Sequence, residues 1–217
     1  MAGLTQADAE AFYAAHYAPD NAILVVAGDV DPDQVKAMAE THYGPIPPAG
    51  NIQPRNRPSE PPQIAPRRLT LTDERVSEPY VSRIYLAPER DPGDQKKAAA
   101  LVYLAELLGG NGTTSVLARA MQFDSQTAVY TAAGYDGTSL DNTTFSLVVV
   151  PLPGVTLEQA EAKLDQVIAD FIKTGPDPAA FERVKTQIKA ADIYSRDDAE
   201  GLANRYGEAL STGLTIK

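Results

Sequence analysis

A proline-rich stretch between residues 44 and 66 is the feature that most limits how this chain can fold. Eight prolines fall within it, and its apolar residues follow no regular period. Each proline fixes its own backbone angle and lacks an amide donor, so neither a helix nor a central strand can run through the segment. We therefore expect an extended linker at residues 45–66, between a short first unit, residues 1–44, and a larger second domain, residues 67–217.

The first unit has the pattern of a strand between two helices. Thr5 and Asp8 form a helix-start signal, because the Thr5 hydroxyl can accept a hydrogen bond from the Asp8 amide. This helix is expected to end at about residue 17. Residues 22–27 are apolar without interruption, which predicts a strand buried on both faces. Asp31 and Pro32 then predict the start of a second helix that ends near residue 43.

The second domain alternates strand patterns with helix patterns. Period-two alternation predicts strands at residues 68–72, 80–86, 127–133 and 143–150, the last two as an antiparallel pair. Apolar residues at helical spacing predict helices at residues 95–108, 115–121, 157–174, 181–191 and about 198–212. Strands followed by runs of helices indicate an α+β fold, in which helices pack on one face of a mostly antiparallel sheet.

Composition excludes several classes of partner and chemistry. The net charge of −10 repels phosphate backbones and anionic lipid, so we expect no nucleic-acid partner. The longest apolar run, residues 147–152, is too short to span a bilayer, so we expect no membrane insertion. The absence of cysteine excludes disulfides, thiolate metal sites and thiol nucleophiles. Both ends look cut, and we expect the chain to be a fragment of a longer protein.

Candidate catalytic and metal-binding residues are few. His16 and His42 lie near the ends of the two predicted helices of the first unit, and neither has a histidine or glutamate at zinc-ligand spacing. Packing at a helix end explains them better than a metal site, so the sequence predicts no metal ligand and no catalytic residue. The glycine-rich residues 109–115 lack the lysine of a phosphate-binding loop and are interpreted as a turn between helices. Acidic pairs at residues 29/31 and 197/198 are interpreted as helix caps, and no serine lies in a nucleophile elbow.

Several segments nevertheless resemble one peptidase family. They are residues 4–8, 11–22, 25–32 and 43–47 in the first unit, and residues 104–110, 114–117, 203–207 and 212–213 in the second. The first group is similar to the end of the first domain of pitrilysin/insulinase-type zinc peptidases. The second group resembles the second domain of that family's mitochondrial-processing-peptidase-like branch.

The resemblance implies a non-catalytic half of a zinc metallopeptidase. The family's H-x-x-E-H motif is absent here, since His16 and His42 are each followed by unrelated residues. Zinc is therefore expected in the parent protein and not in this chain, which should be inactive alone. Its implied role is to enclose and bind a peptide or unfolded segment, in the manner of half a clamshell. The alternative is a pseudo-peptidase with a structural or assembly role, like the respiratory-chain core proteins. For a bacterial parent the resemblance favours the periplasm.

One residue is implied as a substrate contact. Substrate-binding subunits of the family carry an arginine seven residues before a tyrosine at the start of the second-domain hairpin. The tyrosine matches Tyr130 here, but Phe123 replaces the arginine and cannot donate a hydrogen bond. An ordinary strand tyrosine is the alternative interpretation of Tyr130. The missing arginine implies a homologous partner subunit that supplies the rest of the substrate clamp.

Overall fold

The computed structural model of the protein describes residues 3–50, 52, 57–59 and 61–216. Within the predicted linker, residues 51, 53–56 and 60 lie outside the described residues. The chain divides into two compact units. One contains the stretch up to Pro58 together with Ser195–Ser211, and the other contains Ser59–Tyr194. The linker and domain bounds expected from the sequence stay a prediction.

The first unit consists of short helices and an extended segment. Its helices are α1 (Gln6–His16), the 3-10 turn η1 (Pro19–Asn21), α2 (Pro32–His42) and α6 (Ala199–Ser211). The predicted caps are confirmed: Asp8 donates its amide to the Thr5 hydroxyl at 3.3 Å, and the Asp31 carboxylate accepts from the amide of Asp33 at 2.9 Å. None of the residues in α1, α2 or α6 is buried.

The predicted strand at residues 22–27 is wrong. These residues form neither a helix nor a strand, and Ile23, Leu24 and Val26 are 49%, 56% and 48% exposed. A strand needs a hydrogen-bonded neighbour, and in the described part of the first unit none lies beside this segment. The apolar composition therefore identified a segment that could form a strand, but it did not predict whether a second strand would pair with it.

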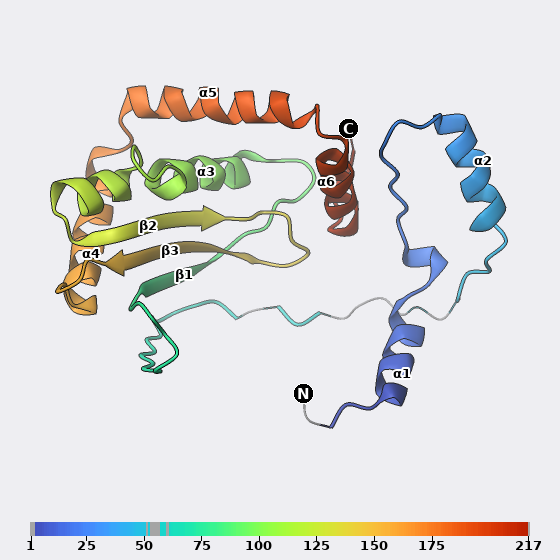
Figure 1. Cartoon of the computed structure of the whole chain (residues 1–217), viewed down its shortest axis with the longest axis horizontal. Coiled ribbons are helices and arrows are strands. Elements are labelled where there is room, and N and C mark those ends of the chain that lie inside the picture. Colours follow the sequence, from blue (N-terminus) through green and yellow to red (C-terminus); the bar gives the residue numbers. More distant parts are fainter. Residues whose placement is uncertain (1–2, 51, 53–56, 60, 217) are drawn as a thin grey trace. The chain divides into compact units, whose positions relative to one another are not determined.

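The second unit is a sheet with a helical layer (Figure 1). Its strands are β1 (Val81–Ala87), β2 (Ala128–Tyr135) and β3 (Thr143–Pro151), all antiparallel in the order β1-β3-β2. Its helices are α3 (Lys96–Ala105), the π-helical turns η2 (Glu106–Gly110) and η3 (Ala118–Asp124), α4 (Leu157–Thr174) and α5 (Pro178–Ser195). The expected α+β class with a mostly antiparallel sheet is confirmed.

Helices α3 and α4 and the turns η2 and η3 pack on one face of the sheet. Alternate residues of β3, Phe145, Leu147 and Val149, are buried and join one cluster with Leu117 and Leu164 from the helices. Helix α5 lies over α3, where the rings of Phe181 and Tyr103 are 5.4 Å apart (Figure 1). Because side chains alternate along a strand, the remaining residues of each strand point away from this layer.

Local signals place the ends of α4 as expected. The Thr156 hydroxyl accepts from the Gln159 amide at 3.2 Å, and the Gln159 side chain accepts from the Thr156 amide at 2.9 Å. Gly175 ends the helix with a φ of 72°, a left-handed conformation that favours glycine. The 18-residue helix presents its buried residues Ala160, Leu164 and Val167 to the sheet.

The predicted strand at residues 68–72 is wrong as well. The segment forms no strand and lies outside the three-stranded sheet, and Leu69 and Leu71 are 90% and 79% exposed. No backbone hydrogen bond joins it to β1 within the described residues. The strand predicted next to it, at residues 80–86, is confirmed as β1.

Candidate functional site

The helix-free face of the sheet is the first candidate site. We define it by the strand residues that point away from the helical layer, which follow from the register of the three strands. Several of them are apolar and open to solvent, with Ile84 66% exposed and Leu86 38% exposed. They are Ser82, Ile84 and Leu86 of β1, Tyr130, Ala132 and Gly134 of β2, and Thr144, Ser146, Val148 and Val150 of β3.

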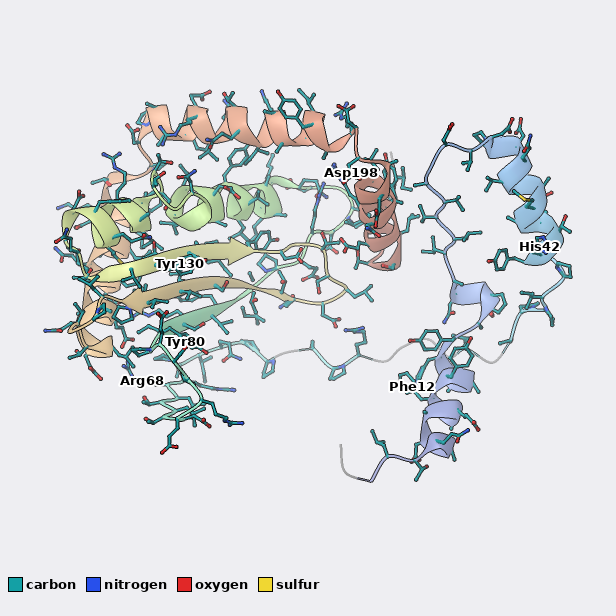
Figure 2. All side chains as sticks on the ribbon, viewed as in Figure 1. Phe12, His42, Arg68, Tyr80, Tyr130 and Asp198 are labelled. Atoms are coloured by element: carbon teal, nitrogen blue, oxygen red, sulfur yellow. The ribbon has the colours of Figure 1, made fainter. Side chains whose placement is uncertain are left out.

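Tyr130 is the largest side chain of this face. It pairs with Val150 across the ladder, next to a bulge between Ala128 and Tyr130, and its side chain is 53% exposed (Figure 2). Its hydroxyl has no hydrogen-bond partner among the described residues, so it is free to donate to or accept from a ligand. Phe123, in η3, is 54% exposed and offers only an apolar ring.

The glycine-rich residues 109–115 form a turn, as predicted. Gly109 and Gly110 end η2, and the Asn111 side chain then accepts from the amides of Thr113 and Thr114 at 2.9 and 3.0 Å. Gly109 lies directly against β2, where an added Cβ atom would collide with the backbone of Ala132 and Ala133. The turn therefore joins the helical layer closely to the sheet.

The helix-end positions predicted for the two histidines match the structure, and of the acids predicted as caps Asp31 and Asp198 are confirmed. His16 and His42 lie in the last turns of α1 and α2, and Figure 2 labels His42. His16 contacts the ring of Phe12, with the ring centres 4.4 Å apart. Asp198 accepts from the Gly201 amide at 3.0 Å at the start of α6. No group of three potential metal ligands occurs within residues 3–50, 52, 57–59 and 61–216.

An ion cluster beside β1 was missed by the sequence reasoning. The Arg68 guanidinium donates to both carboxylate oxygens of Glu161, with the Nη1–Oε1 distance 2.9 Å. The Arg83 guanidinium of β1 donates to Glu161 at 3.1 Å and to Asp165 at 2.5 Å. Hydrogen bonds from Arg68 and Arg83 lower the pKa of Glu161, and those from Arg83 lower the pKa of Asp165. The sequence signal for this cluster was the spacing of Glu161 and Asp165, which lie four residues apart and therefore share one face of α4.

This cluster predicts a loss of stability in acid. Because the pKa of Glu161 is lowered from its ordinary value of 4.5, its bonds stabilise the fold above that pH and are lost as the pH falls. We expect Glu161→Gln to lower the free energy of unfolding by about 1–3 kcal/mol at neutral pH and to flatten its decline below pH about 4.5. Urea unfolding at a series of pH values measures both effects.

Glu182→Gln is the control for this prediction. Glu182 pairs with Lys185 on the surface of α5 at 2.9 Å, and its side chain is 66% exposed. Such an exposed pair contributes about 0–1 kcal/mol. Equal unfolding curves for the two variants at every pH would show that the cluster does not stabilise this unit.

A groove lies between residues 63–71 and β1. Its volume is about 910 Å³. It is lined by residues 63–71, by residues 80–86, which include most of β1, and by residues at the start of α4. Figure 2 shows Arg68 and Tyr80, which both line it. Exposed apolar side chains, Ile64, Leu69 and Ile84, lie on its walls, so a ligand here would meet both apolar groups and the Arg68–Glu161 pair.

Comparison with known proteins identifies relatives of this chain. Residues 3–188 match the family described as "Peptidase M16 inactive domain". The zinc protease PqqE of Helicobacter pylori is 24% identical over 210 residues, which are 95% of this chain and 46% of that protein. The protein named "Uncharacterized zinc protease ML0855" from Mycobacterium leprae is 24% identical over 216 residues, which are 96% of this chain and 46% of that protein. The chain thus spans about half the length of these curated relatives.

Solved structures share the fold. A protease from Helicobacter pylori has a TM-score of 0.82 and 23% identity, with 98% of this chain and 50% of that chain covered. A peptidase M16 inactive domain from Pseudomonas fluorescens has a TM-score of 0.69 and 18% identity, with 99% and 49% covered. The periplasmic protease PqqL from Escherichia coli has a TM-score of 0.72 and 17% identity, with 100% and 24% covered.

Proposed function

The chain belongs to the peptidase M16 family, as its inactive domain, and from this membership we propose that it binds and helps to enclose peptides that are cleaved at a zinc site outside this chain. The helix-free face of the sheet is the observation that carries the proposal. An exposed tyrosine and exposed aliphatic side chains lie together there. Concave or open apolar surfaces with a few polar groups are the usual contacts of peptide ligands.

Membership confirms the resemblance to pitrilysin/insulinase-type peptidases at the level of the family. The mitochondrial-processing-peptidase-like branch stays a prediction. The names of the curated relatives, both zinc proteases, do not favour the alternative of a structural or assembly subunit. They support zinc in the parent protein as part of the proposal.

Two further parts of the proposal concern partners and location. We propose a homologous subunit or domain as the second half of the enclosure, because Phe123 leaves Tyr130 without the arginine of the family's clamp. We propose the periplasm as the compartment, in line with the periplasmic protease among the structural neighbours. Within the described residues no helix combines the length and hydropathy needed to cross a bilayer.

Peptide binding to the helix-free face can be measured directly. We expect Tyr130→Ser to weaken binding of a fluorescein-labelled, unstructured, aliphatic-rich peptide about tenfold, because an aromatic contact contributes about 1–2 kcal/mol. Fluorescence anisotropy on the purified chain gives the affinity. Tyr194→Ser is the matched control, since Tyr194 is a 75% exposed tyrosine on α5, on the helical side of the same unit. Equal affinities for the two variants would contradict the proposed role of this face.

The isolated chain is expected neither to hold zinc tightly nor to hydrolyse the same peptide. A catalytic zinc site needs three protein ligands and an open position, whereas His16 and His42 end two different helices with no second ligand at zinc spacing. Elemental analysis of dialysed protein and a quenched-peptide assay with and without chelator measure both properties. Stoichiometric zinc that is lost in the double variant His16→Gln, His42→Gln would contradict the expectation, as would chelator-sensitive cleavage.

A further inference from the structure

A second pocket opens on the helical side of the second unit. Its volume is about 330 Å³, at the lower end of the range of about 300–1,000 Å³ that is usual for small-molecule sites. Helices α4 and α5 and the turns η2 and η3 contribute to its walls. π-Helical turns are rare in proteins and often occur at functional sites, and here two of them border one pocket.

Part of the pocket lining is apolar. Leu107 and Val167 are 6% exposed and Val184 is 7% exposed, so these side chains belong to the buried interior and also face the pocket. An apolar group that leaves water for contact with them gains free energy in proportion to the area it buries. The pocket therefore suits a ligand with a hydrocarbon part.

Three basic side chains also line the pocket: Arg119 of η3, Lys163 of α4 and Arg183 of α5. None of these side chains makes a hydrogen bond or an ion pair with another described residue. Lys163 is half-buried, whereas the two arginines are exposed, so its ammonium group loses hydration without gaining an acceptor. A bound anion would supply that acceptor.

The acidic residues of the lining limit how much negative charge a ligand can carry. They are Glu106, Asp170 and Asp177. Asp177 already accepts from the Ala180 amide at 2.8 Å, at the start of α5. Because the lining holds as many acids as bases, a polyanion would meet like charges as well as opposite ones. A ligand with one carboxylate can pair with Lys163 and place no further charge near the acids.

We propose that this pocket binds a small organic acid with an apolar body and a single carboxylate, of the kind represented by a medium-chain fatty acid. The carboxylate accepts from the ammonium group of Lys163, and such charge-assisted hydrogen bonds are about twice as strong as neutral ones. The hydrocarbon part contacts Leu107, Val167 and Val184. This site is separate from the helix-free face, on which the proposed peptide binding rests.

Octanoate is the probe for this site. Titration into the purified ¹⁵N-labelled chain, followed by NMR, gives the dissociation constant and the amides that shift. We expect octanoate to bind at least about tenfold more tightly than octylamine, which has the same chain length and a positive head group, and than tripolyphosphate. Equal affinity for octanoate and octylamine, tighter binding of tripolyphosphate, or shifts confined to the helix-free face would each overturn the proposal.

Lys163→Met tests the ion pair directly, because it keeps an unbranched side chain and removes the charge. We expect it to weaken octanoate binding about tenfold. Lys173→Met is the matched control, since Lys173 lies on the same helix and is not part of the lining, and its affinity should equal that of the native chain. Circular dichroism and urea unfolding verify that both variants are folded. Equal affinities for the two folded variants would refute the role of Lys163.

Competition separates this site from the peptide surface. Octanoate at saturation should leave the anisotropy of the labelled peptide unchanged. Displacement of the peptide by octanoate would refute an independent site. Failure of the labelled peptide to bind at all would contradict the proposed function and leave the octanoate measurements as they stand.

Discussion

Replacing Gly109 with alanine is expected to destabilise the second unit by about 3 kcal/mol or more. The added methyl group would collide with the backbone of Ala132 and Ala133 in β2. A flexible side chain could move aside, but a strand paired along its length with β3 cannot move without losing its ladder. The midpoint of urea unfolding, followed by circular dichroism, measures the loss.

Gly112→Ala is the matched control in the same turn. Nothing lies within 4 Å of the position that its Cβ atom would occupy, and its backbone is not left-handed. Replacing a glycine of this kind changes stability by less than about 1 kcal/mol, and in the stabilising direction, because the unfolded chain loses freedom. If both variants unfolded at the same urea concentration, the close contact between η2 and β2 would not matter for stability.

The helices were largely predictable from the sequence because their signals are local. The caps at Thr5, Asp31 and Thr156 satisfy amides within three residues of themselves, and Gly175 ends α4 through its own backbone angle. The helical layer on one face of the sheet was predictable for a related reason. Long strands with one buried face, followed by amphipathic helices, leave little other way to cover the apolar side.

The two wrong strands show what local patterns omit. Residues 22–27 and 68–72 have strand composition, but a strand exists only where another backbone supplies hydrogen bonds. Which segment becomes that partner depends on chain packing far from the segment itself. In the described structure neither segment belongs to a helix or to the sheet, so both strand predictions were wrong for want of a pairing partner.

The candidate site was predictable only in part. Tyr130 was named from a resemblance, and the structure places it on the helix-free face, where its exposure gives it access to a ligand. Its role in binding remains a proposal. The Arg83–Glu161 pair was not predicted, because 78 residues separate the two partners and no local pattern connects them. The groove depends on that same cluster and was equally invisible in the sequence.

Truncating Leu164 to alanine is expected to lower the free energy of unfolding of the second unit by about 2–5 kcal/mol. Leu164 is fully buried at the middle of α4 and belongs to the cluster that also contains Leu147, Val149 and Leu117. Its removal leaves a cavity between α4 and the sheet, where side chains are held on both sides and cannot collapse inward completely. Urea unfolding measures the change.

Ile172→Ala on the same helix separates burial from helix propensity. Ile172 is 76% exposed, so its truncation removes little buried area, and we expect the free energy of unfolding to change by no more than about 0.5 kcal/mol.

The same two variants also test peptide binding. Ile172→Ala should bind the labelled peptide like the native chain, whereas Leu164→Ala should lose binding only under conditions where the unit unfolds. Loss of binding in a fully folded Leu164→Ala variant would mean that the ligand contacts the helical layer, and that the helix-free face is not the binding surface.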